Sequence, residues 1–446
     1  MERLFGTDGI RGVANEWPLT PQFITRLGEA IGQVLGRGEH TQALIGRDTR
    51  QSGAMIENAL AAGMMARGLD TLHLGVLTTP GVAYLTHKLG ACCGISISAS
   101  HNPFEDNGIK VFGADGFKVP DASEGEIEAL AQSSADQKRG RAIGVRRDST
   151  ASVDGYVDFL LGAVEHAKIL NGQRVVVDCN NGATFDLSKR VLGALGAQVI
   201  ALNDAPDGVN INRGYDSLEP RWLRETVLRE HAAWGVQFDG DGDRAVFVDE
   251  RGGYVDGDFV LAILACDFVA RGQLKTRSVV STVMANSGLE RSLGEIGVTL
   301  ERTAVGDRWV TDRMRATGAH MGGEQSGHIV LFDGGHTTGD GLYTAIRVAQ
   351  VLARRGESLA ALAACMTKYP QVLINVRVPH KPPLEQLPQV QTQLALSQSA
   401  LGDRARILLR YSGTENLARV MIEGNDAALI AREANAIAQV IQQTIT

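Results

Sequence analysis

The sequence predicts an α/β protein in which three units of similar build follow one another along the chain. Apolar strands are expected at residues 43–46, 174–178 and 278–282, and each runs into a polar turn and then a helix. This order is typical of parallel or mixed sheets covered by helices. The second and third turns also resemble each other weakly, in N-G-A and A-N-S-G. We therefore expect three related α/β units.

The C-terminal part has a different pattern. Strand-like runs at 372–378, 405–410 and 418–423 precede an apolar-periodic helix at 427–445. Asn425 or Asp426 is expected to cap that helix at its N-terminus. These features predict an α+β unit in which helices cover one face of an antiparallel sheet.

A chain of 446 residues is too long for a single core, which indicates three or four domains. Polar or glycine-rich stretches near residues 131–152, 251–253 and 368–370 are candidate boundaries. The predicted domains are residues 1–150, 151–252, 253–367 and 368–446.

The composition excludes several classes of protein. The net charge of -7 argues against nucleic acid as the main partner, because phosphate backbones favour basic faces. Five cysteines, an odd number with no C-x-x-C spacing, indicate a reduced cytoplasmic protein rather than a disulfide framework. The N-terminus has no signal-type apolar core, and the apolar run 259–270 is too short to cross a bilayer.

The segment G-I-S-I-S-A-S-H-N-P at 94–103 reads as a buried strand that ends in a polar turn. It leaves Ser100 and His101 at a strand tip, where open α/β sheets usually carry their sites. A hydroxyl at that position can accept and return a phosphoryl group. A serine that only caps the turn explains the segment alone equally well.

Asp239, Asp241 and Asp243 alternate with glycines in D-G-D-G-D-R, a predicted tight turn between two strands. Three carboxylates so close together require a cation, and hard oxygen ligands favour Mg²⁺ or Ca²⁺. An EF-hand is excluded because Arg244 stands where that loop needs glycine. An exposed acidic turn is the alternative.

Two further polar turns are weaker signals. G-G-E-Q-S-G-H at 322–328 offers the carboxylate, amide, hydroxyl and imidazole that sugar hydroxyls need as partners. R-Y-S-G-T-E-N at 410–416, with Arg419 beyond it, can form an anion-binding nest between two strands. Ordinary turn residues explain either motif in isolation.

Two cations near other motifs could stabilise a phosphoryl group in transfer. Arg11 lies in a glycine-rich turn, F-G-T-D-G-I-R-G at 5–12, and Lys110 is on the strand after the serine loop. Both could instead be ordinary surface charges.

Taken together, the chain resembles the α-D-phosphohexomutase superfamily. The resemblance spans nearly the whole chain and rests on six motifs in the family's order: F-G-T-D-G-I-R-G, S-A-S-H-N-P, D-N-G-I-K, D-G-D-G-D-R, G-E-Q-S-G-H and R-Y-S-G-T-E-N. Gln325 favours the glucosamine branch over the phosphomannomutase and phosphoglucomutase relatives. One departure is Asn416, because the family's phosphate loop usually ends in proline, which would fix φ.

The resemblance implies four domains around a central cleft, the last one similar to the TATA-binding protein. Ser100 would be the phosphoserine, and Asp239, Asp241 and Asp243 would hold one Mg²⁺ together with its phosphate. The remaining implied residues fall into three groups. Sugar contacts would come from Glu324, Gln325 and Ser326. The substrate's phosphate would be bound by Arg410, Ser412, Gly413, Thr414 and Arg419. Charge stabilisation or proton transfer would fall to Arg11, His101, Lys110, Arg244 and His328, which cannot be ranked.

The implied reaction interconverts glucosamine 6-phosphate and glucosamine 1-phosphate through a glucosamine 1,6-bisphosphate intermediate, and its product would feed UDP-N-acetylglucosamine synthesis and peptidoglycan precursors. A sugar bisphosphate or a kinase would first phosphorylate Ser100, and the family suggests a homodimer. Three alternatives stay open: the same chemistry on glucose or mannose phosphates, a serine hydrolase, and a non-catalytic sensor. The hydrolase lacks a G-x-S-x-G elbow and leaves the aspartates unexplained. A sensor would be expected to lose the serine or the aspartates.

Overall fold

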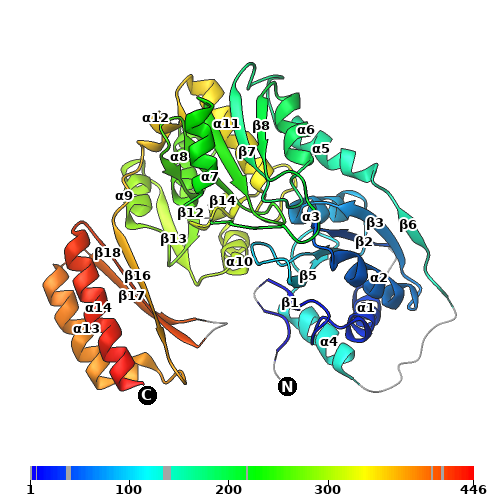
Figure 1. Ribbon diagram of the computed structural model, residues 1–446, viewed down its shortest axis with the longest axis horizontal. Coiled ribbons are helices and arrows are strands. Elements are labelled where there is room, and N and C mark those ends of the chain that lie inside the picture. The colour runs from blue at the N-terminus through cyan, green and yellow to red at the C-terminus, as the bar shows by residue number, and fades with distance from the viewer. Residues whose placement is uncertain are drawn as a thin grey trace. The chain divides into compact units, whose positions relative to one another are not determined.

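The structure is a computed structural model that describes residues 3–6, 8–36, 42–133, 142–216, 219–402, 405–412 and 416–445 (Figure 1). The chain divides into two compact units. The larger contains Met1–Ala285 and Leu293–Cys365, and the smaller contains Asn286–Ser292 and Met366–Thr446.

The first domain has a mixed sheet in the order β1-β5-β4-β2-β3-β6. The strands β2, β3, β4 and β6 run parallel, whereas β5 is antiparallel to β4 and β1 is antiparallel to β5. Its elements are β1 (Ile10–Val13), α1 (Pro21–Leu35), β2 (Gln42–Arg47), α2 (Gly53–Met65), β3 (Asp70–Val76), α3 (Thr79–Lys88), β4 (Cys93–Ile97), β5 (Asp106–Gly113), α4 (Asp121–Gln132) and β6 (Arg146–Asp148).

The second sheet has the order β11-β10-β9-β7-β8, with β7, β8 and β9 parallel and β10 and β11 antiparallel. The elements are α5 (Ser152–Gly162), β7 (Arg174–Asp178), α6 (Leu187–Ala194), β8 (Gln198–Leu202), α7 (Arg221–Arg229), β9 (Trp234–Phe238), β10 (Ala245–Asp249) and β11 (Tyr254–Val255).

The third sheet has the order β13-β12-β14-β15, and only β15 is antiparallel to its neighbour. The elements are α8 (Gly257–Ala270), β12 (Ser278–Thr282), α9 (Ser287–Glu295), β13 (Thr299–Thr303), α10 (Asp307–Thr317), β14 (Met321–Gly323), β15 (Ile329–Leu331), α11 (Gly341–Arg355) and α12 (Leu359–Ala363).

The three sheets share one topology. In each, two strand–helix units lead to a third parallel strand, which turns back into an antiparallel strand: β4 into β5, β9 into β10, and β14 into β15. The serine motif, the aspartate motif and the G-E-Q-S-G-H motif occupy these three equivalent turns. The predicted relationship between the units is therefore confirmed, and it places one chemical motif at the same point of each repeat.

The smaller unit carries an antiparallel sheet in the order β16-β18-β17 with helices packed on it. Asp426 caps α14 by accepting hydrogen bonds from the N–H groups of Ala428 and Leu429. The predicted α+β unit is thus confirmed. Its elements are β16 (Gln371–Arg377), η1 (Leu384–Gln386), α13 (Pro388–Leu401), β17 (Ala405–Tyr411), β18 (Leu417–Gly424) and α14 (Ala427–Thr444).

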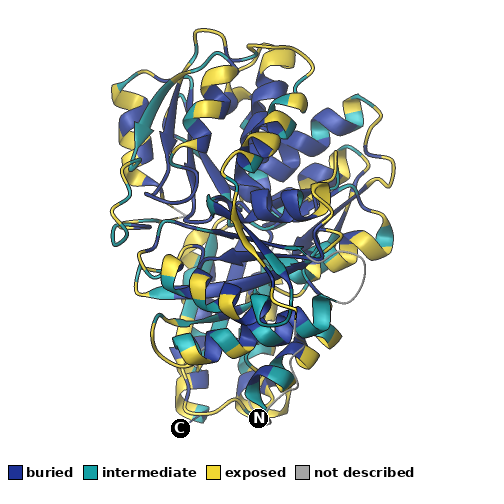
Figure 2. Cartoon of the chain, turned by 90° about the vertical axis from the view of Figure 1, so that its right-hand side faces the viewer, coloured by how far each residue is buried: buried dark blue, intermediate teal, exposed yellow. Residues whose placement is uncertain are grey.

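The most deeply buried residues of the larger unit include the central strands of its sheets. The central strands β4, β9, β10 and β12 are buried along their whole length, and so is α11 from Gly341 to Leu352, whereas α1 and α7 each have an exposed side (Figure 2). Within the described part of the chain, no helix is long and apolar enough to cross a membrane.

One sequence prediction needs correction. The segment 5–12 is not a turn throughout: Gly6 and Gly9 close a short turn, and β1 begins at Ile10 because that residue pairs with Ile109 of β5. Arg11 is therefore on a strand.

Candidate active site

Ser100 lies in the turn between β4 and β5 and is almost fully buried. Its backbone has a φ of 52°, in the left-handed region that non-glycine residues rarely adopt. The conformation is held by the carbonyl oxygen, which accepts from Arg50 Nη2 at 3.1 Å and from Asn212 Nδ2 at 2.7 Å. The hydroxyl donates to Asp239 Oδ2 at 2.6 Å. Strain at a fixed, buried hydroxyl is typical of functional positions.

The three aspartates of the β9–β10 turn converge in one buried cluster, with ligand oxygens within 4.8 Å of one another. Burial, together with the carboxylates of Asp243 and Asp241, raises the pKa of Asp239 well above its usual range. Burial acts in the same direction on Asp241, but Lys110 Nζ, at 2.8 Å, overrides it and lowers that pKa to about 2. A divalent cation bound among the three carboxylates would favour their charged forms.

The residues present fit a divalent metal. Asp241 Oδ1 and Asp243 Oδ1 are buried and have no hydrogen-bond partner among the residues that the structure describes. Buried carboxylate oxygens without partners are costly, and hard oxygen donors are the ligands that Mg²⁺ prefers. The Asp239, Asp241 and Asp243 triad can therefore hold a metal ion.

The cations expected from the sequence surround this cluster. Lys110 Nζ also lies 3.2 Å from Asp243 Oδ2 and 3.0 Å from Asp8 Oδ2. Arg244 Nε lies 3.9 Å from Asp239 and 3.8 Å from Asp243. Together with Arg11, which lies beside the serine turn, they place positive charge where a phosphoryl group would carry negative charge.

Arg11 and His101 both contact the serine turn. Arg11 donates to the carbonyl of Ala99 at 3.3 Å and pairs with Asp8. His101 Nδ1 lies 3.4 Å from Ser100 Oγ. Partial desolvation, then the positive charges of Arg244 and Arg11, lower the pKa of His101, so the ring is neutral at pH 7 even though the residue is exposed at the surface.

The turn between β14 and β15 joins the aspartate turn through the backbone. Ala245 N–H donates to the carbonyl of Gly327, and Arg244 forms a bridge with His328. Glu324 accepts from Gly306 N–H at 3.2 Å, while Gln325 and Ser326 are half-buried. The structure thus brings the serine, aspartate and G-E-Q-S-G-H turns together in the larger unit.

The fourth domain holds the predicted phosphate motif. Arg410 on β17 pairs directly opposite Arg419 on β18. Burial and the charge of Arg419 lower the pKa of Arg410. Like charges at opposed positions destabilise a sheet, so an anion would be bound favourably there. Ser412 is buried, and its carbonyl accepts from Lys381 Nζ at 2.8 Å. Gly413 and Thr414 lie outside the described residues.

Sequence reasoning missed several residues that support the site. Asp48 pairs with Arg50 at 2.9 Å and accepts a hydrogen bond from Ser98 Oγ at 2.6 Å. These two contacts hold the serine turn in place. Thr79 Oγ1 donates to Asp241 Oδ2 at 2.6 Å. The R-D-T-R turn after the strand 43–46 was the available signal, because polar turns at the carboxyl ends of parallel strands meet at one edge.

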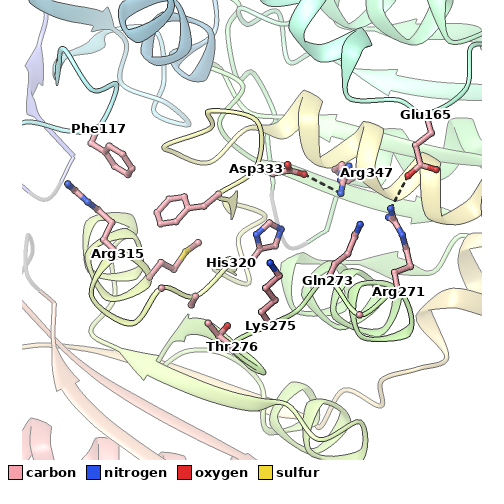
Figure 3. A pocket seen from close by; sticks show the side chains of 15 residues that line it. Phe117, Glu165, Arg271, Gln273, Lys275, Thr276, Arg315, His320, Asp333 and Arg347 are labelled. Carbon is pink, nitrogen blue, oxygen red and sulfur yellow. Dashed lines mark hydrogen bonds and ion pairs between the residues drawn. The ribbon is translucent and has the colours of Figure 1, made fainter.

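A cavity of about 820 Å³ lies apart from this cluster, in the larger unit (Figure 3). Its arginines already have partners: Arg347 is 3.3 Å from Asp333, and Arg271 is 2.8 Å from Glu165. Because none of its lining residues belongs to the serine and aspartate cluster, we do not assign this cavity to the chemistry.

Comparison with known proteins agrees with the fold. Models of the phosphoglucomutase/phosphomannomutase α/β/α domains I, II and III match residues 2–138, 154–253 and 256–369, and the model of the C-terminal domain matches residues 373–440. The chain therefore belongs to the phosphoglucomutase/phosphomannomutase family, whose members are phosphohexose mutases.

Several full-length relatives are phosphoglucosamine mutases. The phosphoglucosamine mutase of Symbiobacterium thermophilum is 48% identical over 99% of both chains, and that of Halorhodospira halophila is 47% identical over 98% of this chain and 96% of the relative.

Solved structures share the fold. A phosphoglucomutase/phosphomannomutase family protein from Burkholderia thailandensis aligns with a TM-score of 0.82 and 23% identity, over 99% of this chain and 97% of the other. The Aspergillus fumigatus N-acetylphosphoglucosamine mutase, solved with GlcNAc-6P and magnesium, aligns with a TM-score of 0.68 and 16% identity, over 99% and 96%.

Proposed function

We propose that the chain interconverts glucosamine 6-phosphate and glucosamine 1-phosphate, with Ser100 as the phosphoryl carrier. The observation that carries this proposal is the buried hydrogen bond from Ser100 Oγ to Asp239, inside a carboxylate triad and beside Lys110. Relatives of the same length that are 43–48% identical and named phosphoglucosamine mutase support the choice of sugar.

Two phosphoryl transfers balance the reaction. In the first, the bond between phosphorus and Ser100 Oγ breaks while a bond forms to O1 of glucosamine 6-phosphate, whose hydroxyl proton is lost. In the second, the 6-phosphoryl group of the bisphosphate returns to Ser100 Oγ, and O6 regains a proton. Each step needs alignment and charge neutralisation more than covalent chemistry from other groups.

The residues around Ser100 meet those needs. Lys110, Arg11 and Arg244 are the cations that would stabilise the transferring group. The neutral His101 ring and His328 are the candidates for moving the hydroxyl proton. One Mg²⁺, held by Asp239, Asp241, Asp243 and the Ser100 phosphate, would neutralise charge on the phosphoryl oxygens.

Substrate recognition is assigned to two motifs. Glu324, Gln325 and Ser326 are proposed to bind the sugar, because their half-buried side chains offer donors and acceptors together. Arg410, Ser412 and Arg419 of the fourth domain, with Gly413 and Thr414, are proposed to bind a phosphate group of the substrate. A sugar bisphosphate or a kinase would supply the first phosphoryl group, and the product would feed UDP-N-acetylglucosamine synthesis.

The test follows glucosamine 6-phosphate by ³¹P NMR with the full chain, Mg²⁺ and a trace of glucosamine 1,6-bisphosphate. A glucosamine 1-phosphate signal is expected for the wild-type chain. Ser100→Ala should lose at least about a thousandfold of the rate because the carrier is gone. Ser149→Ala, at a half-buried surface serine, is the matched control. Turnover retained by Ser100→Ala would refute the assignment.

A further inference from the structure

A line of alternating charges runs from the aspartate turn towards His328. Lys110 Nζ contacts Asp241 at 2.8 Å and Asp8 at 3.0 Å. Asp8 also forms an ion pair with Lys118 Nζ at 2.6 Å, and Lys118 forms a second ion pair with Asp307. The side chains of Asp8, Lys118 and Asp307 are 20%, 14% and 13% exposed, so these charges depend on one another for compensation.

The last ion pair of this line, between Lys118 and Asp307, joins two domains. Lys118 lies after β5 in the first domain, and Asp307 is the first residue of α10 in the third. An aspartate at a helix N-terminus is favourable by itself, because it faces the positive end of the helix dipole. That explanation accounts for the helix but not for the histidine beside it.

His328 is buried, at 2% exposure, and its ring nitrogens have no hydrogen-bond partner within the part of the chain that the structure describes. Asp307 Oδ2 lies 3.8 Å from Nε2 of the ring. Gly339 packs flat against the imidazole, since a Cβ there would lie 2.4 Å from Nε2. Packing limits where the ring can lie, whereas a neighbouring acceptor such as a carbonyl or a carboxylate favours one orientation of its N–H groups.

We propose that Asp307 is a positioning residue that orients the His328 imidazole, and that Lys118 holds the Asp307 carboxylate in place from the first domain. The inference rests on the proposed function for its kinetic consequence. Although burial opposes ionisation, Lys118 lowers the pKa of Asp307, so the carboxylate is charged at neutral pH. A carboxylate that fixes an imidazole in this way acts through the histidine and not on the substrate.

The competing explanation is that the ion pair only docks the two domains. The neighbouring residue provides the matched control. Arg308, also in the first turn of α10, pairs instead with Asp121 and Glu124 of the first domain. Arg308→Gln removes an interdomain ion pair of the same kind and leaves the line of charges intact.

Steady-state kinetics of the full chain with Mg²⁺ separate the two explanations. Asp307→Asn and Lys118→Met should lower kcat about tenfold or more while KM changes less than about twofold, and Arg308→Gln should leave kcat within about twofold. Placed in a His328→Gln background, Asp307→Asn should cause no further loss, because its effect passes through the histidine. An equal loss in both backgrounds, or an equal loss in Arg308→Gln, overturns the proposal.

A second readout does not depend on turnover. With ¹⁵N-labelled histidine, the ring signals of His328, assigned by their loss in His328→Gln, should shift in Asp307→Asn and Lys118→Met but not in Arg308→Gln. Unchanged ring signals in Asp307→Asn would overturn the proposal even if the rate fell. If the wild-type chain shows no mutase activity, the proposed function fails, and the NMR comparison still decides whether Asp307 positions His328.

Discussion

Ser100 Oγ and Asp239 Oδ2 are 2.6 Å apart, although the two residues lie 139 positions apart and in different domains. The contact exists because the turn after β4 and the turn after β9 are equivalent points of two repeats that face each other. A hydroxyl and a carboxylate triad are thereby buried together, and neither sequence motif could do the proposed chemistry without the other.

Metal binding should stabilise the folded chain. Mg²⁺ at about one hundred times its Kd would add about 2.7 kcal/mol, which corresponds to a melting temperature several degrees higher. Asp241→Asn should remove most of this gain, because it deletes one buried carboxylate ligand. Asp158→Asn on the exposed face of α5 should keep it. Differential scanning fluorimetry with and without EDTA measures the effect, and an equal Mg²⁺ response in both variants would argue against the triad as the site.

Gly240 should not tolerate a side chain. A Cβ there would lie 2.5 Å from the Ser100 carbonyl oxygen and 2.8 Å from Asn212 Nδ2, so Gly240→Ala must displace the serine turn. We expect about a tenfold or larger fall in kcat in a folded protein, since small misplacements of reacting groups are costly. Gly193→Ala on α6 meets nothing within 4 Å and should be neutral or stabilising by up to about 1 kcal/mol. Equal activity of the two variants would contradict the described packing.

Asp340 should give the folded chain a pH-dependent stability. Burial raises its pKa from 3.8 to about 7, although Tyr156 donates to it at 2.6 Å. Between these two values the folded chain holds a proton that the unfolded chain has lost, so stability from this group falls as pH rises and levels off above pH 7. In this range the free energy of unfolding contributed by Asp340 falls by about 1.4 kcal/mol per pH unit.

Urea unfolding at pH 5, 6, 7 and 8 with constant Mg²⁺ measures this effect. Asp340→Asn keeps a capping side chain at the start of α11 but cannot titrate. The stability of the wild-type chain relative to this variant should therefore decrease from pH 5 to 7 and then stay constant. Parallel pH profiles would show that Asp340 does not carry the proton.

The opposed arginines of the fourth domain should favour an anion over an empty site. Arg419→Met is expected to stabilise the antiparallel sheet by up to about 1 kcal/mol, because it removes a like-charge pair. It should also raise KM for the sugar phosphate about tenfold or more, because a charged hydrogen bond contributes about 1.5–3 kcal/mol. Arg432→Gln, on the exposed side of α14, is the control for general charge. A KM unchanged by Arg419→Met would remove this residue from the phosphate site.

The local secondary structure could be predicted from the sequence. Strand, turn and helix patterns predicted the α/β repeats and the α+β end because each depends on neighbours in the chain. The convergence of three aspartates around alternating glycines was also predictable, since a tight turn leaves few other arrangements.

The features that depend on strand order were not predictable in the same way. Asp8, Lys118 and Asp307 resemble ordinary surface charges in the sequence. The fold of the first domain joins Asp8 to Lys118, and its packing against the third domain joins Lys118 to Asp307. Arg11 was expected in a turn and lies on β1, because pairing with β5 extends the strand through a glycine-rich segment. Asp48 and Asn212 support the serine turn from elements far away in the chain.

The central claim is tested most directly by the rates on three sugars. Glucosamine 6-phosphate, glucose 6-phosphate and mannose 6-phosphate are compared with the same chain, Mg²⁺ and the matching bisphosphate. The account predicts the largest kcat/KM for the amino sugar, with a smaller preference in Gln325→Ala. Equal or higher kcat/KM values on the neutral sugars would contradict it and assign the same scaffold to glucose or mannose phosphates.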